Sequence, residues 1–189
     1  MLPVILTAAL TFGVLFLIDK TFTGLFRNKQ QYQSGLSVRL PKGNGIAGIL
    51  LTALAALILV TDFGDSQKLM TFAGVFIGAL GIGLSVYYMS FGVYYDEETF
   101  LYNSFGSKSA AYRYSDIKGQ KLYVVQGGGI LVELYMEDGK TVALQSRMEG
   151  VYPFLDKAFY RWCAQRGIAP ESCDFHDPNN SLWFPSLEE

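Results

Sequence analysis

The sequence predicts an α-helical membrane protein that also carries an α+β domain, and three observations predict this combination. Residues 2–18, 46–61 and 69–93 are apolar runs that contain no charged side chain, as membrane-spanning helices require. From Tyr94 onward, apolar side chains recur at every second position, which is the period of a β-strand. Close to the end they recur at helical spacing. We therefore expect three transmembrane helices, then an antiparallel sheet or open barrel capped by a C-terminal helix.

The composition agrees with this fold class. Hydrophobic residues make up 50% of the 189 residues and charged residues 17%, below the roughly 25% charge of soluble domains. The net charge of −2 gives no general attraction to nucleic acid, so none is expected as a partner.

The predicted membrane region covers residues 1–93. Its first run, 2–18, is near the short end of the roughly 17–25 residues that a spanning helix needs. It lacks the basic start and small-residue cleavage site of a secretory signal, which favours a retained helix. The third run closes with Tyr87, Tyr88 and Tyr94, and tyrosines are typical of the membrane interface.

The orientation follows from basic residues in the short connecting loops. The loop 19–45 carries more Lys and Arg than the 61–68 turn, where Lys68 is the only basic residue. Basic loops remain in the cytoplasm, so three crossings place the amino terminus outside and the C-terminal domain inside. The basic residues of the first loop are Lys20, Arg27, Lys29, Arg39 and Lys42.

The third run carries a face of small residues, Gly74, Gly78, Gly81 and Ser85, at helical spacing. Small residues let membrane helices approach closely. The face either packs against the second helix, which offers Gly48, Thr52 and Ala56, or forms a seam for a partner or second copy.

The second half, residues 94–169, is expected to fold as an antiparallel meander followed by one helix. Asp138-Gly139 lies between two alternating runs and is a strong hairpin signal. From Gly150 an apolar stripe predicts a helix that ends near Gly167. The expected strands fall within residues 99–105, 110–114, 122–125, 130–136 and 141–145.

This half resembles a bacterial PH-like domain between Gly92 and Gly167. The resemblance is carried by Tyr112–Ile117, where an aromatic strand enters a Ser-Asp-Ile turn, by the hairpin Leu134–Lys140, and by the closing helix. It implies a bacterial inner-membrane protein with a cytoplasmic interaction or scaffold domain and no enzymatic activity. It does not imply phosphoinositide binding, because the chain has no cluster of basic residues in one loop.

The nearest approach to a basic site is Lys108, Arg113, Lys118 and Lys121. Alternation divides these side chains between two faces, which favours a solvated surface over a contact with anionic lipid.

No catalytic, metal or cofactor site is predicted. Cys163, Cys173 and His176 match no zinc spacing, and one histidine supports no Ser-His-Asp set. If the domain were exported, the two cysteines would be candidates for a disulfide.

The tail, residues 170–189, is polar except for Leu182, Trp183 and Phe184. Large apolar side chains in a polar tail indicate docking, either on the chain's own sheet or in a partner's groove.

The sequence therefore favours a non-enzymatic multi-pass membrane protein that presents a scaffold domain. Its expected partners are the lipid bilayer and a protein, or a second copy, bound through the helices or the domain. The alternatives are an accessory subunit of a membrane transport or envelope complex, and a binder that senses lipid or the envelope.

Overall fold

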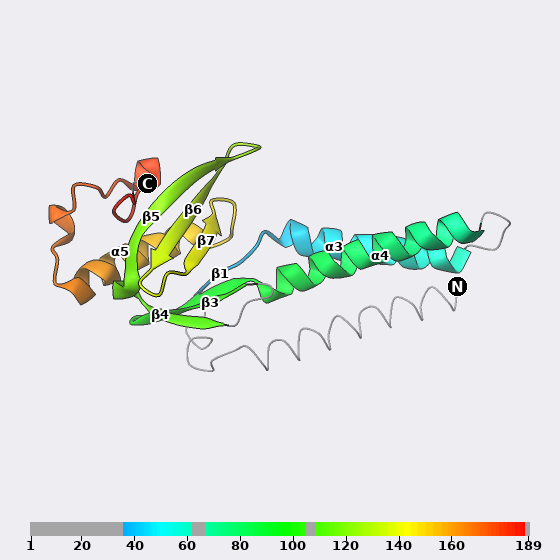
Figure 1. Cartoon of the computed structure of the whole chain (residues 1–189), viewed down its shortest axis with the longest axis horizontal. Helices are drawn as coiled ribbons and strands as arrows, with labels where there is room; N and C mark the ends of the chain where they lie inside the picture. Colours follow the sequence, from blue (N-terminus) through cyan, green and yellow to red (C-terminus); the bar gives the residue numbers. More distant parts are fainter. Residues whose placement is uncertain (1–35, 62–66, 105–108, 188–189) are drawn as a thin grey trace. The chain divides into compact units, whose positions relative to one another are not determined.

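The computed structural model describes residues 36–61, 67–104 and 109–187, with the side chains of 67–69 left out (Figure 1). In this part the chain is an α+β protein with three α-helices and two antiparallel sheets. Its described residues divide into a helical unit, residues 41–61 and 67–91, and a β unit, residues 36–40, 92–104 and 109–187. The first predicted span, 2–18, lies outside the described residues.

The helical unit contains α3 (Lys42–Thr61) and α4 (Gln67–Ser90), which lie side by side. Both are long and apolar enough to cross a membrane. Large apolar side chains point away from the helix pair, with Leu50 64% and Phe72 73% exposed. Such surfaces favour a nonpolar environment, so the two helices are compatible with a membrane location.

The first sheet has the order β1-β2-β3-β4. Its outermost strand, β1 (Ser37–Val38), precedes α3 and pairs with β2 (Gly92–Tyr95), which follows α4. The side chain of Val38 is completely buried, so this short segment belongs to the core of the β unit. The other two strands are β3 (Thr99–Asn103) and β4 (Ala110–Arg113).

Two boundaries differ from the sequence prediction. Helix α4 ends at Ser90 rather than at Val93, because Gly92 and Val93 pair with β3. The predicted loop 19–45 contributes β1 to the sheet, and its last residues already belong to α3.

The second sheet has the order β5-β6-β7, with strands β5 (Ile117–Val125), β6 (Gly129–Met136) and β7 (Thr141–Gln145). Cross-strand pairing gives this sheet one buried face, because Val132, Leu134 and Met136 alternate along β6 with no more than 2% exposure. The predicted hairpin at Asp138-Gly139 joins β6 to β7.

One helix, α5 (Val151–Arg166), packs against the first sheet and against the tail. Phe154 contacts Phe100 of β3, with ring centroids 5.4 Å apart. Gly150 begins the helix with φ 80°, and a Cβ there would lie 2.6 Å from the carbonyl oxygen of Ser37. Only glycine suits this position, since it allows both the left-handed backbone and the close approach.

Candidate functional site

The small-residue face of α4 packs against α3 within the same chain. A Cβ placed on Gly81 would lie 2.7 Å from the backbone nitrogen of Thr52 and 2.9 Å from the carbonyl oxygen of Gly48. A Cβ on Gly48 would in turn meet the backbone nitrogen of Ser85 at 2.9 Å. Between these residues the two helix backbones are therefore in direct contact.

The same face continues toward the other end of the helix pair. Gly78 faces Ala55, at 3.3 Å from a constructed Cβ, and Gly74 faces Leu59 at 2.9 Å. All four residues of the predicted face thus lie against α3 within the chain.

Two hydroxyl groups lie in this interface, and both are satisfied by their own helices. The Oγ1 of Thr52 donates to the carbonyl oxygen of Gly48 at 2.8 Å, and the Oγ of Ser85 donates to that of Gly81 at 2.9 Å. Neither hydroxyl therefore needs water, and the contact suits a lipid environment.

The C-terminal tail lies against the β unit through the residues predicted to dock. Trp183 and Phe184 are buried, while Leu182 is half-buried. The Phe184 ring meets Trp162 of α5 edge-on, and the Trp183 Nε1 donates to the carboxylate of Asp156 at 2.6 Å. The structure thus places the tail on its own domain rather than leaving it extended for a partner.

A single buried amide, Gln120 of β5, fixes the path of this tail. Its Nε2 donates to the carbonyl oxygen of Ser181 at 2.9 Å. Its Oε1 accepts from the backbone nitrogens of Trp183 and Phe184 at 2.9 and 3.0 Å. One side chain thus supplies hydrogen bonds to three tail backbone groups that would otherwise lose their partners on burial.

The backbone of β5 also contributes to the docking. Gln120 donates its N–H to Pro185 at 2.9 Å and accepts from the N–H of Leu187 at 3.1 Å. The neighbouring Gly119 makes this approach possible, because a Cβ there would lie 2.4 Å from the carbonyl oxygen of Pro185.

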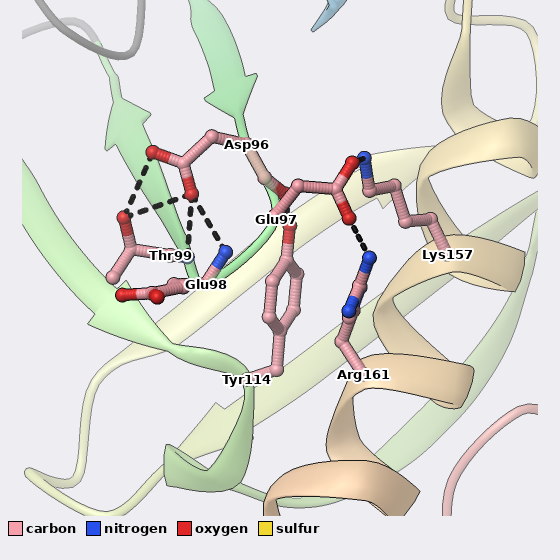
Figure 2. Close-up of polar contacts among 7 residues, drawn as sticks. All are labelled: Asp96, Glu97, Glu98, Thr99, Tyr114, Lys157 and Arg161. Carbon is pink, nitrogen blue, oxygen red and sulfur yellow. Dashed lines mark hydrogen bonds and ion pairs between the residues drawn. The ribbon is translucent and has the colours of Figure 1, made fainter.

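The acidic turn between β2 and β3 is bound to α5 by ion pairs (Figure 2). Glu97 lies between Lys157, at 2.5 Å, and Arg161, two basic residues on the same face of α5. The Glu97 and Arg161 side chains are well exposed, so the pairs orient the turn more than they stabilise the fold.

Beside these pairs, Asp96 and Tyr114 hold the backbone of the same turn (Figure 2). The Asp96 Oδ1 accepts from the backbone nitrogens of Glu98 and Thr99 at 2.9 and 2.7 Å. Tyr114 donates its hydroxyl to the Asp96 carbonyl oxygen at 2.7 Å. Burial, reinforced by the Asp96 charge, raises the pKa of Tyr114 well above its ordinary value, so this donor stays protonated.

The junction between the two sheets is a short 3-10 turn, Tyr114–Asp116, which α5 also holds. Gln165 accepts from the backbone nitrogen of Ser115 at 2.8 Å, and the Trp162 indole donates to the carbonyl oxygen of Ile117 at 2.8 Å. The predicted Ser-Asp-Ile turn therefore marks the point where the chain passes from one sheet to the other.

The candidate lipid contacts are distributed over both sheets. Arg113 ends β4 and is exposed, whereas Lys118 and Lys121 belong to β5. The Lys121 ammonium lies over the Tyr135 ring, 5.9 Å from its centroid. Lys108 lies outside the described residues.

The two cysteines lie close together but are buried. Their sulfur atoms are 4.0 Å apart, and burial raises the pKa of Cys163 to about 11. His176 stacks on the Phe159 ring, with centroids 3.6 Å apart. Among the described residues, no group of His, Cys, Asp and Glu is arranged to hold a metal ion.

Comparison with protein-family models, with curated proteins and with solved structures gives no match. The functional argument therefore depends on the chain's own geometry.

Sequence reasoning missed Gln120 as the residue that orders the tail. A single uncharged residue inside a strand belongs to no recognisable sequence motif. The role of Gln120 depends on contacts with tail residues that lie more than sixty positions further along the chain. The one local signal is Gly119, because glycine within a strand often marks the close approach of another backbone.

Proposed function

We propose that the chain is a non-enzymatic, multi-pass membrane protein whose β unit is a PH-like interaction platform on the cytoplasmic side. In this role the helices anchor the platform, and its exposed surfaces recruit a protein partner of the membrane or cytoplasm.

The observation that carries the proposal is the pairing of β1 with β2. These strands are adjacent in one sheet but are separated along the chain by α3 and α4. If the two helices span a bilayer, two crossings return the chain to the side from which it started, as the strand pairing requires. A pair of membrane-spanning helices, α3 and α4, can therefore be inserted between β1 and β2 while these two strands stay paired in one sheet.

The orientation is supported by the same connection. Because β1 and β2 lie on one side of the bilayer, the basic residues Arg39 and Lys42 lie on the same side as the β unit. Basic juxtamembrane residues remain in the cytoplasm. This supports a cytoplasmic platform in the inner membrane, with the first run, 2–18, placing the amino terminus outside.

The PH-like assignment is supported by the order of the elements. A four-stranded sheet is followed by a three-stranded sheet and then by one C-terminal helix. The motif Tyr112–Ile117 lies at the junction of the sheets, and Leu134–Lys140 forms the β6–β7 hairpin.

The structure bears differently on the alternatives. Because the small face of α4 is used internally, an accessory subunit would contact its complex through the outward faces of α3 and α4. The lipid-sensing alternative has Arg113 and Lys118 as exposed candidates. The platform is favoured because the tail packs onto the β unit through Gln120, so that the sheets, α5 and the tail belong to one compact unit.

Co-purification from native membranes in mild detergent, with a tag after Glu189, tests this function. A platform should recover a stoichiometric protein partner that is absent from a parallel preparation of an unrelated tagged membrane protein. Recovery of this chain alone, or only as copies of itself, would contradict recruitment of another protein.

A further inference from the structure

The hairpin formed by β5 and β6 extends beyond the third strand of its sheet (Figure 1). The pairing of β7 with β6 begins at Leu131, whereas β5 and β6 stay paired as far as Val125 and Gly129. The hairpin tip, residues 123–131, is closed by a turn that contains three successive glycines. It therefore projects from the sheet as a two-stranded ribbon.

The hairpin tip is apolar and exposed on both of its faces. Side chains alternate along a strand, so Val124 and Tyr123 point to opposite faces, where they are 87% and 43% exposed. Val125 is also exposed, and Ile130, the cross-strand neighbour of Val124, is half-buried. A flat protein surface would cover one face of this ribbon, whereas a nonpolar phase surrounds both. The distribution favours lipid as the occupant.

The nearest charges on the two strands lie at one level, well away from the turn. Residues 122–132 contain no charged side chain, and Lys121 lies opposite Glu133. The strand from Lys121 to the end of β5 at Val125 is about 13 Å long. Membrane-surface segments bury apolar side chains about 5–10 Å deep, at the boundary between headgroups and acyl chains. The uncharged length is therefore sufficient for that depth.

The hairpin tip lies at the end of the β unit from which the chain continues into both helices. Strand β1 leads through Arg39 into α3, and β2 begins at Gly92, just after α4. The backbone of Arg39 exchanges hydrogen bonds of 3.0 and 2.9 Å with Glu149. Two residues before Glu149, Arg147 donates to the carbonyl oxygen of Gly127 in the turn of the hairpin. Short contacts thus connect this turn with the segment that enters α3.

We propose that the hairpin tip inserts into the headgroup region of the bilayer that α3 and α4 cross, an inference that rests on the proposed membrane location of these helices. Val124, Val125 and Ile130 then lie at the boundary with the acyl chains. Tyr123 lies at the interface, which accommodates both its ring and its hydroxyl group. Arg147 brings a positive charge to the base of the turn, where it favours anionic headgroups. Together with the two chain connections, this contact restricts rotation of the platform at the membrane surface.

The test uses the full-length chain in vesicles of phosphatidylcholine and phosphatidylglycerol, with a nitroxide spin label on one introduced cysteine. Collisions with dioxygen, which concentrates in lipid, and with a water-soluble nickel chelate report the depth of the label. We expect Val124→Cys to collide mostly with dioxygen, as should Phe72→Cys on the outward face of α4. Glu171→Cys, at an exposed position of the β unit, should collide mostly with the chelate. The unsubstituted chain is the blank, because Cys163 and Cys173 are buried.

The two lipid-facing labels separate failure of the insertion from failure of the proposed function. Lipid exposure of Phe72→Cys together with water exposure of Val124→Cys would overturn the insertion and leave the membrane anchor intact. Water exposure of Phe72→Cys would contradict the membrane location of α4, and the insertion with it. A Val124→Cys label shielded from both reagents would assign the hairpin tip to a protein contact instead of lipid.

A charge placed on the hairpin tip gives an independent measurement. With the label on Val125→Cys, a second change, Val124→Asp, should lower the inserted population about tenfold, because the contact loses an apolar side chain and gains a carboxylate. Val124→Leu keeps an apolar side chain at the same position and should preserve insertion. Equal dioxygen collision rates in the Asp and Leu variants would contradict insertion of the tip.

Discussion

Gln120 shows how much of the β unit depends on one residue. The side chain is completely buried and serves three backbone groups of the tail, while its backbone serves two more. Buried polar groups that lose a partner each cost about 1–3 kcal/mol. The tail is therefore ordered by a local network rather than by hydrophobic contact alone.

Gln120→Leu should release the tail without unfolding the sheet. Leucine retains most of the volume but leaves the backbone groups of Ser181, Trp183 and Phe184 without partners. A cost of about 2 kcal/mol raises the open population about 30-fold. Hydrogen exchange of the Trp183 and Phe184 amides should accelerate accordingly. Gln145→Leu, at an exposed position of β7, is the matched control, and equal exchange in both variants would contradict the role of Gln120.

At the scale of elements, α3 and α4 illustrate how glycine determines helix packing. Where Gly48 and Gly81 face each other, the helices approach to backbone contact, and neither position has room for a side chain. Two residues further on, Gly83 has nothing within 4 Å of a constructed Cβ. The same helix therefore offers a glycine that the packing requires and one that it does not.

Gly81→Ala should destabilise the helix pair, whereas Gly83→Ala should not. The added methyl group forces the backbones apart, and overpacking of this kind costs about 1–3 kcal/mol. Thermal unfolding of the purified chain in detergent should show a lower midpoint for Gly81→Ala only. Because the contact lies within one chain, the loss should not change on dilution. A loss that grows on dilution would indicate that copies of the chain share this face.

The sequence predicted an element correctly where the element is long and its hydrophobic pattern or turn signal lies within the element itself. Alternation predicted β6 and β7, the Asp138-Gly139 turn predicted their hairpin, and the apolar stripe predicted α5. It could not reveal β1, which has two residues and no period, and whose partner β2 begins only after α4. The helix face was identified from spacing, but only the structure shows that α3 covers it.

For the whole molecule, the pairing of β1 with β2 restricts every possible membrane topology. Ser37 lies opposite Tyr94 and Val38 opposite Val93, so the chain before α3 and the chain after α4 meet in one sheet. Arg39 exchanges two backbone hydrogen bonds with Glu149, which ties the same segment to the residues just before α5. An even number of crossings between these strands is the only arrangement that keeps the sheet intact.

Membrane-impermeant maleimide labelling of intact cells tests this arrangement. Gly43→Cys, an exposed position with space for a side chain, and Glu171→Cys in the β unit should both be labelled only after permeabilisation. Ser66→Cys, between α3 and α4, should be labelled from outside. Labelling of Gly43→Cys and Glu171→Cys from opposite sides would contradict two crossings, since β1 and β2 could then not pair. Labelling of both from outside would keep the pairing but reverse the orientation, and would show that Arg39 and Lys42 do not direct the platform to the cytoplasm.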